Sequence, residues 1–261
     1  MHPIRLLIKH RNILWAVSRN SIKSRYAGSS LGLIWAVIYP MLFLTIYSAV
    51  FIGILKVRLE QFAGIDYVLL IFCALVPWFG FSESLASGVS SVTSNANLIR
   101  NTLFPIELIP VQSVIVSSVT QIVGLAILVI ILFAKGLLGA ASLFIIVSFG
   151  LQLLFTIGLI WLLSAINVII RDIGQVIPVF ILMLMLVSPI GYTEDMIPEQ
   201  MLPYMRFNPL YFMVALYREP LMFNRLPDWE VILVFSVVSV SVFYFGFWVF
   251  RRLKGVFSDY V

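Results

Sequence analysis

Charged residues and cysteines are scarce in this chain of 261 residues. Charged side chains make up 11% of the sequence and hydrophobic ones 61%, whereas a soluble domain carries about 25% charged residues. This composition excludes an ordinary soluble protein, and membrane spans of roughly 20 residues each leave no room in the chain for a large soluble domain. The single cysteine, Cys73, excludes an intrachain disulfide and a zinc site built from several cysteines.

Motifs for nucleotide binding and catalysis are also missing. No glycine is followed by lysine anywhere in the chain, which excludes the P-loop that cradles nucleotide phosphates. If ATP drives this protein, another chain must bind it. The two histidines, His2 and His10, have no acidic residue nearby, and no nucleophile, base and orienting group converge. We therefore expect neither an enzyme nor a metal site or cofactor in this chain.

Long apolar runs dominate what is present, and the mean hydropathy is +1.06. Each run is long enough, the fifth only just, for a helix that crosses the hydrocarbon core of a bilayer. The sequence thus predicts an all-α, polytopic integral membrane protein, with residues 1–261 forming one transmembrane domain. The six predicted spans cover residues 31–54, 67–89, 108–134, 141–169, 174–191 and 230–250.

The distribution of lysine and arginine predicts that both chain ends lie in the cytoplasm. The segment before the first apolar run contains six basic residues and no acidic one. Six spans then bring Arg251, Arg252 and Lys254 to the same side, as the positive-inside rule favours. Basic residues placed beside an apolar run indicate a membrane surface, rather than nucleic acid, as the partner.

Two segments outside the spans have recognisable patterns. In residues 1–30, apolar residues recur at helical spacing with basic residues between them, which predicts an amphipathic helix in the inner interface. A flexible basic tail is the alternative. Residues 192–229 are aromatic, apolar and interrupted by prolines, which favours short or re-entrant helices at the outer interface. The prolines are Pro198, Pro203, Pro209, Pro220 and Pro227.

An aromatic row is the first candidate binding feature. Side chains four residues apart share one face of a helix, and the first predicted span carries four aromatic rings at this spacing. They either line a path for flat ligand faces, sugar rings included, or pack against other spans and lipid. The row consists of Trp35, Tyr39, Phe43 and Tyr47, with Pro40 as a probable kink within it.

Polar and small residues within or beside the spans form a second group of candidates. Glu83 lies in the second span, where a charge is costly and normally faces protein or water. It either lines a pathway or binds a coupling ion, or pairs with a neighbouring helix. Arg171 and Asp172, at an inner turn, are expected to form an ion pair or helix-end contacts. Gly28 and Gly32 form a G-x-x-x-G pattern that lets another helix approach closely.

The polar inner segment between the second and third spans predicts a short helix over residues 93–104. Asn97, Asn101 and Arg100 flank Leu98 and Ile99, and Pro105 follows. A helix there, parallel to the membrane, would dock on a cytoplasmic partner. An ordinary connecting loop is the alternative.

Motifs in a fixed order run along almost the whole chain. They are RYAGSSLGLIWAVIYP (25–40), VPW (76–78), NLIRNTLFP (97–105), NVIIRD (167–172), SPIGY (188–192) and NPL (208–210). Together these motifs resemble those of the permease subunits of type-2 ABC exporters, particularly the polysaccharide-exporting branch. The resemblance is closest to O-antigen export permeases, with capsule and teichoic-acid permeases as near relatives.

This resemblance implies a homodimer of six-helix subunits in the bacterial cytoplasmic (inner) membrane. Two copies of a separate ATPase, which bind ATP and Mg, would drive export of a lipid-linked polysaccharide. The aromatic row would contact the sugar chain. The N-terminal helix and the coupling helix would face the ATPase, the latter through Asn97, Leu98, Ile99, Arg100, Asn101 and Phe104. Interfacial or gating roles fall to Arg25, Gly28, Gly32, Glu83, Arg171, Asp172, Pro189 and Tyr192.

Two other functions fit parts of the pattern. An exporter of a drug or a lipid from the same superfamily would also use an aromatic row. A membrane-embedded transferase acting on lipid-linked sugars would need acidic or histidine residues that converge at one membrane face. Glu83, Glu107 and Asp172 do not evidently converge in the sequence.

Overall fold

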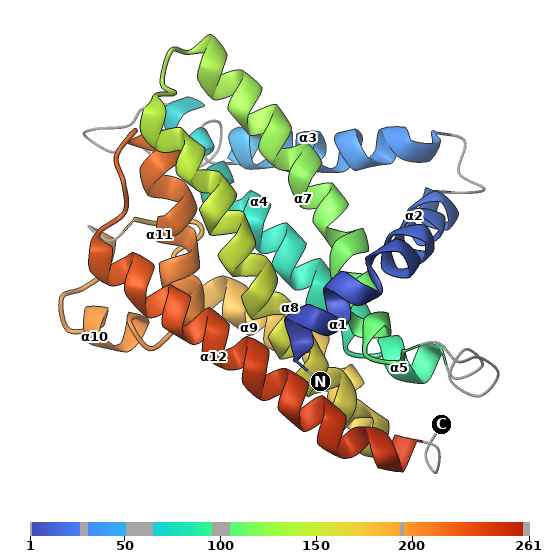
Figure 1. The fold of residues 1–261 in the computed structure, drawn as a ribbon. Helices are drawn as coiled ribbons and strands as arrows, with labels where there is room; N and C mark the ends of the chain where they lie inside the picture. Colours follow the sequence, from blue (N-terminus) through green and yellow to red (C-terminus); the bar gives the residue numbers. More distant parts are fainter. Residues whose placement is uncertain (1, 27–30, 51–64, 96–104, 194–195, 258–261) are drawn as a thin grey trace.

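The described part of the chain is entirely helical, without a β-strand (Figure 1). The computed structural model describes residues 2–26, 31–50, 65–95, 105–193 and 196–257. In chain order the α-helices are α1 (Pro3–Lys9), α2 (Arg11–Tyr26), α3 (Trp35–Ser48), α4 (Ile65–Gly88), α5 (Ser91–Ser94), α7 (Leu108–Ala134), α8 (Ile145–Ile169), α9 (Asp172–Val187), α10 (Leu202–Met205), α11 (Pro209–Met222) and α12 (Trp229–Leu253).

Among the residues that the structure describes, four helices are long and apolar enough to cross a membrane. They are α4, α7, α8 with the 3-10 turn Ala140–Phe144 before it, and α12 with the turn Lys254–Val256 after it. Their bounds lie within a few residues of the predicted spans 67–89, 108–134, 141–169 and 230–250. The chain is therefore an integral membrane protein. The central helix is α4, whose apolar stretch is 83% buried inside the protein.

The other two predicted spans correspond to shorter apolar helices. Helix α3 has 14 residues and α9 has 16, or about 21–24 Å at 1.5 Å per residue, which is less than the roughly 30 Å hydrocarbon core. The prediction 31–54 extends beyond α3 into residues outside the described part. The prediction 174–191 exceeds α9 because the chain leaves the helix at Ser188, where the backbone is extended.

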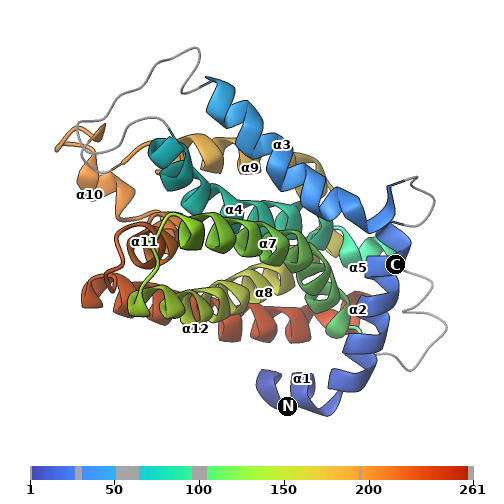
Figure 2. The same cartoon turned by 90° about the horizontal axis from the view of Figure 1, so that it is seen from above.

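The helices form layers around α4. Seen from above, α4 and α7 lie between α3 and α9 on one side and α8 and α12 on the other (Figure 2). The most extensive packing joins α8 to α12 and α4 to α7. Backbones touch between α8 and α12, since a Cβ added to Gly158 would lie 2.5 Å from the backbone nitrogen and Cα of Phe243. The absence of a side chain at Gly158 therefore lets α8 and α12 approach more closely than larger residues would permit.

The N-terminal segment folds as two helices rather than one. Helix α1 ends at Lys9 and α2 begins at Arg11. Ser21 of α2 accepts a hydrogen bond from Gln112 Nε2 of α7 at 2.5 Å. Apolar residues lie on both the buried and the exposed sides: Leu14 is 8% exposed and Trp15 is 64% exposed. The segment is thus anchored to the bundle on one face while its other face presents apolar side chains.

The proline-rich segment after α9 contains α10 and α11, and its prolines act differently. Pro209 begins α11, where its missing N–H costs nothing. Pro220 does not break the segment as the sequence suggested, because it lies inside α11. A proline there deprives the carbonyl of Leu216 of its helical donor. The Ser148 hydroxyl of α8 supplies the bond instead, at 2.7 Å, so α11 continues through the proline.

Candidate functional site

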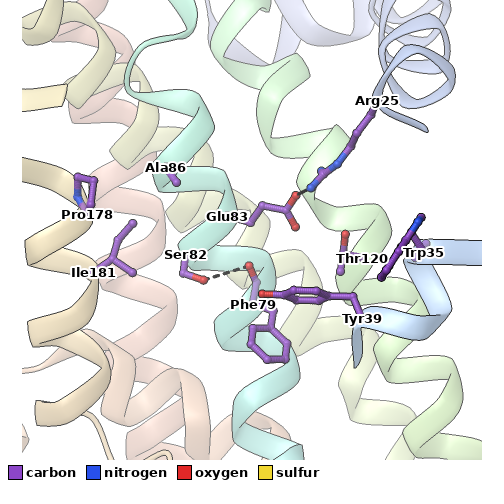
Figure 3. Close-up of a pocket in the computed structure, with 11 residues that line it drawn as sticks. Arg25, Trp35, Tyr39, Phe79, Ser82, Glu83, Ala86, Thr120, Pro178 and Ile181 are labelled. Carbon is purple, nitrogen blue, oxygen red and sulfur yellow. Dashed lines mark hydrogen bonds and ion pairs between the residues drawn. The ribbon is translucent and has the colours of Figure 1, made fainter. Parts of the chain in front are cut away.

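A cavity of 520 Å³ lies where five helices meet: α2, α3, α4, α7 and α9 (Figure 3). Four of its lining residues are among the candidates that the sequence singled out: Trp35 and Tyr39 from the aromatic row, and Arg25 and Glu83 from the interfacial or gating group. The sequence did not single out the rest of the lining, which consists of Ala36, Phe79, Ser82, Ala86, Thr120, Pro178 and Ile181. Aromatic and charged candidates from three helices, α2, α3 and α4, thus line one cavity.

An ion pair forms the polar wall of this cavity. Arg25, near the end of α2, contacts the Glu83 carboxylate of α4 (Figure 3). The Glu83 side chain is 22% exposed and that of Arg25 is 39% exposed. A carboxylate in a membrane span is costly without compensation, and the Arg25 guanidinium supplies an opposite charge beside it. The sequence left the partner of Glu83 open, and the structure supplies Arg25.

The aromatic row lies on one face of α3, as its spacing predicted, but only part of it reaches the cavity. Trp35 and Tyr39 line the cavity and are 42% and 44% exposed. The Tyr39 ring lies edge-on to Phe79 of α4, with 5.6 Å between centroids. Phe43 packs on the same Phe79 at 4.7 Å, and Tyr47 stacks on Phe43 at 6.3 Å. Helix packing thus accounts for Phe43 and Tyr47, while two rings remain open to a ligand.

The glycine pattern before α3 is only half described. Gly28 lies outside the described residues. Gly32 begins a 3-10 turn, Gly32–Ile34, with a φ of +50°, a left-handed conformation that residues with a Cβ rarely adopt. No described atom of the chain lies within 4 Å of a Cβ added there. The turn itself therefore requires glycine at position 32, and close approach by another helix remains a prediction.

The inner segment predicted as a coupling helix is described only at its edges. Its first residues belong to α5, whose N-cap is Ser90; Asn97, Leu98, Ile99, Arg100, Asn101 and Phe104 lie outside the described residues. Just after it, the buried Glu107 pairs with Lys254, with 2.9 Å between Oε1 and Nζ. The backbone oxygen of Glu107 accepts a hydrogen bond from Trp161 Nε1 at 2.8 Å. Glu107, three residues after this segment, is therefore fixed to α8 and to the residue that follows α12.

The turn between α8 and α9 contains Arg171 and Asp172, which are both exposed. Asp172 is the first residue of α9, where a carboxylate interacts favourably with the helix dipole. The helix-end contact expected from the sequence is thus present for Asp172. Asn167, buried in α8, accepts a hydrogen bond from the backbone N–H of Gly174 at 2.9 Å. This bond fixes the turn.

At the opposite end of α9, two side chains hold the backbone of residues 189–192. Arg218 of α11 donates to the carbonyl oxygens of residues 189, 190 and 192, at 2.9 to 3.2 Å. The Tyr67 hydroxyl of α4 donates to that of Gly191 at 3.0 Å. Arg218 is only 7% exposed. Predicted gating residues Pro189 and Tyr192 thus belong to a segment whose four carbonyls are all bound.

Further contacts stabilise the same segment. The Tyr192 hydroxyl donates to the backbone oxygen of Val187 at 2.9 Å, and burial raises the pKa of Tyr192 above its ordinary value. Asn208 donates to Ser188 Oγ at 3.0 Å while its own oxygen caps α11. Sequence reasoning missed Arg218, although an arginine within the apolar run that forms α11 is a signal of a specific buried contact.

Comparisons with known proteins agree on one family. The chain is 28% identical over 251 residues to the O-antigen export system permease protein RfbA of Klebsiella pneumoniae, covering 95% of this chain and 94% of that protein. It is 25% identical over 260 residues to the protein of the same name from Myxococcus xanthus, covering 98% of both. The polysialic acid transport protein KpsM of Escherichia coli is 24% identical over 245 residues, covering 90% of this chain and 91% of that protein.

These alignments extend over nearly the full length of both partners, so the likeness concerns the whole transmembrane domain. Residues 12–222 match the family described as ABC-2 type transporter. The matched stretch runs from α2 to the end of α11 and includes every residue that lines the cavity. The chain belongs to the ABC-2 type transporter family.

Proposed function

We propose that this chain is the transmembrane subunit of an ATP-driven exporter that moves a lipid-linked, O-antigen-like polysaccharide across the bacterial cytoplasmic membrane. The observation that carries the proposal is the near full-length similarity to relatives named for O-antigen export and polysialic acid transport. Those names share a polysaccharide cargo. The aromatic, hydroxyl-rich cavity at the meeting point of five helices supports the same cargo class.

The proposal includes a homodimer with two copies of a separate ATPase that binds ATP and Mg. No P-loop occurs in the sequence, which is consistent with a partner that hydrolyses ATP. The segment Asn97–Phe104 is proposed as the coupling helix. Its neighbour Glu107 is bonded to α8 and to Lys254 beyond α12, so a displacement of this segment would be transmitted to two long helices.

We also propose six spans, with α3 and α9 crossing beside the four long helices and both termini in the cytoplasm. The apolar runs 31–54 and 174–191 supply the length that α3 and α9 alone lack. The end of α12 and the start of α7 are joined by the Glu107–Lys254 pair, so they belong to the same side. Basic residues Arg251 and Arg252 at that end favour the cytoplasmic side.

A polymer longer than the membrane cannot be enclosed in one alternating cavity. We therefore propose that ATP binding closes the ATPase dimer, that the coupling and N-terminal helices transmit the movement, and that α3 and α9 reposition to open a continuous path. Both helices line the cavity through Trp35, Tyr39 and Ile181. The path would carry the chain stepwise, with the aromatic rings as contacts for sugar faces.

Co-purification and a deletion strain test the proposal. The chain is expressed with its genomic neighbours, isolated in detergent, and its partners and their stoichiometry are measured. We expect a two-to-two complex with a P-loop ATPase, and lipid-linked polysaccharide retained inside cells that lack this gene. Purification without any ATPase, or unchanged surface polysaccharide in the deletion strain, would contradict the proposal.

A further inference from the structure

The two walls of the cavity differ in chemistry. On one side Trp35 and Tyr39 of α3 present partly exposed rings, and Phe79 supports the Tyr39 ring from α4. On the other side lie the charged groups of Arg25 and Glu83. Figure 3 shows the Glu83 carboxylate between Arg25, Thr120 and the Tyr39 ring. A ligand in this space would meet aromatic faces and strong hydrogen-bonding groups at once.

An ion pair in this position is weak evidence for a stabilising role. Removing two charges from water is costly, and well-packed apolar residues commonly stabilise a buried site as well or better. A carboxylate offers about four acceptor positions and a guanidinium five N–H donors, and both groups of this pair line the cavity. Arg25 and Glu83 therefore have the properties of groups kept for a ligand.

A sugar ring matches both walls. Its hydroxyl groups both donate and accept hydrogen bonds, and its apolar C–H face stacks on aromatic rings. The cavity volume of 520 Å³ falls within the roughly 300–1,000 Å³ of small-ligand sites. The charges of Arg25 and Glu83 cancel, so the pair offers no net attraction for an anion. These features favour an uncharged sugar over a phosphate or an acidic sugar.

We infer that Arg25, Glu83, Trp35 and Tyr39 form a subsite for one uncharged sugar unit of the cargo, with the ion pair binding ring hydroxyls and the aromatic side chains stacking on the ring face. This inference rests on the proposed function, and it adds a polar half to the aromatic lining. Glu83 then acts as a binding residue in addition to joining α4 to α2. A chain passing through the cavity would be held one unit at a time.

The test measures ATP hydrolysis by the purified complex of this chain with its ATPase in lipid nanodiscs. The probe is lipid-linked polysaccharide isolated from the strain that encodes this chain, added at increasing concentration. For Glu83→Gln and Trp35→Ala we expect the half-saturating concentration to rise about fivefold or more, as the loss of a charged hydrogen bond or of a stacking surface predicts. Hydrolysis without polysaccharide is measured in parallel for every variant.

The sign of the Glu83→Gln effect identifies the ligand. An uncharged sugar loses a strong acceptor and binds more weakly. An anionic group held by Arg25, such as a lipid phosphate, would bind more tightly once the neighbouring carboxylate is neutralised, and a lower half-saturating concentration would overturn the inference. Asp66→Asn is the matched control, because Asp66 also lies on α4 in an ion pair, with Lys135, outside this cavity.

Two further outcomes separate the inference from the function. If the wild-type complex is stimulated by polysaccharide but Glu83→Gln and Trp35→Ala keep its half-saturating concentration, the subsite is wrong and the exporter stands. If both variants change only the hydrolysis without polysaccharide or the melting temperature, the pair has a structural role and the subsite is likewise wrong. If the wild-type complex neither exports polysaccharide nor responds to it, the proposed function itself fails.

Discussion

The side-chain amides of Gln121 and Gln152 bind each other inside the helix bundle, each donating to the oxygen of the other, at 2.7 and 3.0 Å. The pair joins α7 to α8 and continues to the hydroxyl of Tyr217, which donates to Gln152 Oε1 at 2.6 Å. Gln152 also donates to the backbone oxygen of Pro77 at 2.9 Å. Four helices thus meet through hydrogen bonds in an apolar interior.

Replacing one member of this amide pair should destabilise the protein. Gln121→Met keeps the length of the side chain but leaves polar atoms of Gln152 without their partner, which costs about 1–3 kcal/mol when buried. We expect a lower melting temperature in detergent. The double variant Gln121→Met/Gln152→Met should recover part of the loss, because both amides of the pair are gone. If the melting temperature of the double variant falls by the sum of the decreases in the two single variants, pairing is contradicted.

The glycine contact between α8 and α12 gives a second prediction. Gly158→Ala places a methyl group against the backbone of α12, where overpacking costs roughly 1–3 kcal/mol. Gly150→Ala is the control in the same helix, because nothing lies within 4 Å of its added Cβ. Melting curves should show a loss for the first variant and none for the second. Equal melting temperatures would mean that the two helices are less close in the membrane.

Arg218 is predicted to hold residues 189–192 in place. In the variant Arg218→Gln, the glutamine side chain is shorter and has fewer N–H donors, so it cannot bind the three carbonyls that Arg218 binds. Residues 189–192 should therefore separate from α11 more often. A cysteine introduced at Gly191, where an added Cβ meets nothing within 4 Å, reports this as faster thiol labelling. Background labelling is low because the native Cys73 is fully buried.

The control for this experiment is Arg225→Gln. Arg225 pairs with Glu219 near the end of α11, and its side chain is 67% exposed, so an exposed surface pair of this kind contributes little. We expect wild-type labelling at Gly191→Cys in that background. Faster labelling in both backgrounds would indicate a general loss of stability rather than release of the segment.

Loss of Lys254 should destabilise the protein, because its ion-pair partner Glu107 is buried. Lys254→Gln removes the cation beside a carboxylate that is 6% exposed, and an uncompensated buried charge is destabilising. The melting temperature should fall, and Lys254→Gln/Glu107→Gln should restore it in part. Lys135→Gln is the control, because its partner Asp66 is 40% exposed. An equal decrease in the control would show that burial is not the cause.

Tyr39→Ala should slow export of polysaccharide more than it slows ATP hydrolysis. The Tyr39 ring lies in the cavity, so its loss weakens contact with cargo while the ATPase remains intact. Surface polysaccharide in the complemented deletion strain and hydrolysis by the purified complex are compared. Tyr244→Ala is the control. Tyr244 lies on α12 and contacts His2, and it does not line the cavity. An equal loss of both activities would place Tyr39 in packing or coupling.

The long helices could be predicted from the sequence because hydrophobicity and length determine them. The span predicted at 108–134 coincides with α7. Shorter helices were less predictable, since an apolar run does not show where the backbone leaves a helix. Helix α9 ends at Val187, where the contacts of Arg218 and Tyr67 with the following carbonyls begin.

The cavity could be predicted only in part. The aromatic spacing correctly placed Trp35 and Tyr39 on one face, because that relation is local to a helix. The partner of Glu83 is 58 residues away in the sequence, and no periodicity specifies such a pairing. Arg218 escaped notice for a related reason: its partners are backbone carbonyls, which every residue offers and no sequence pattern identifies.

The backbone contact between α8 and α12 has a mechanical consequence. A Cβ at Gly246 would lie 1.9 Å from the carbonyl oxygen of Gly158, so no layer of side chains separates the two helices and neither can slide along the other without first separating. Together they form a fixed wall. The cavity lies on the other side of α4 from these two helices. It is lined there by the shorter helices α3 and α9, which have many exposed side chains. The proposed widening of the cavity for a polymer would therefore move α3 and α9 relative to the fixed pair of α8 and α12.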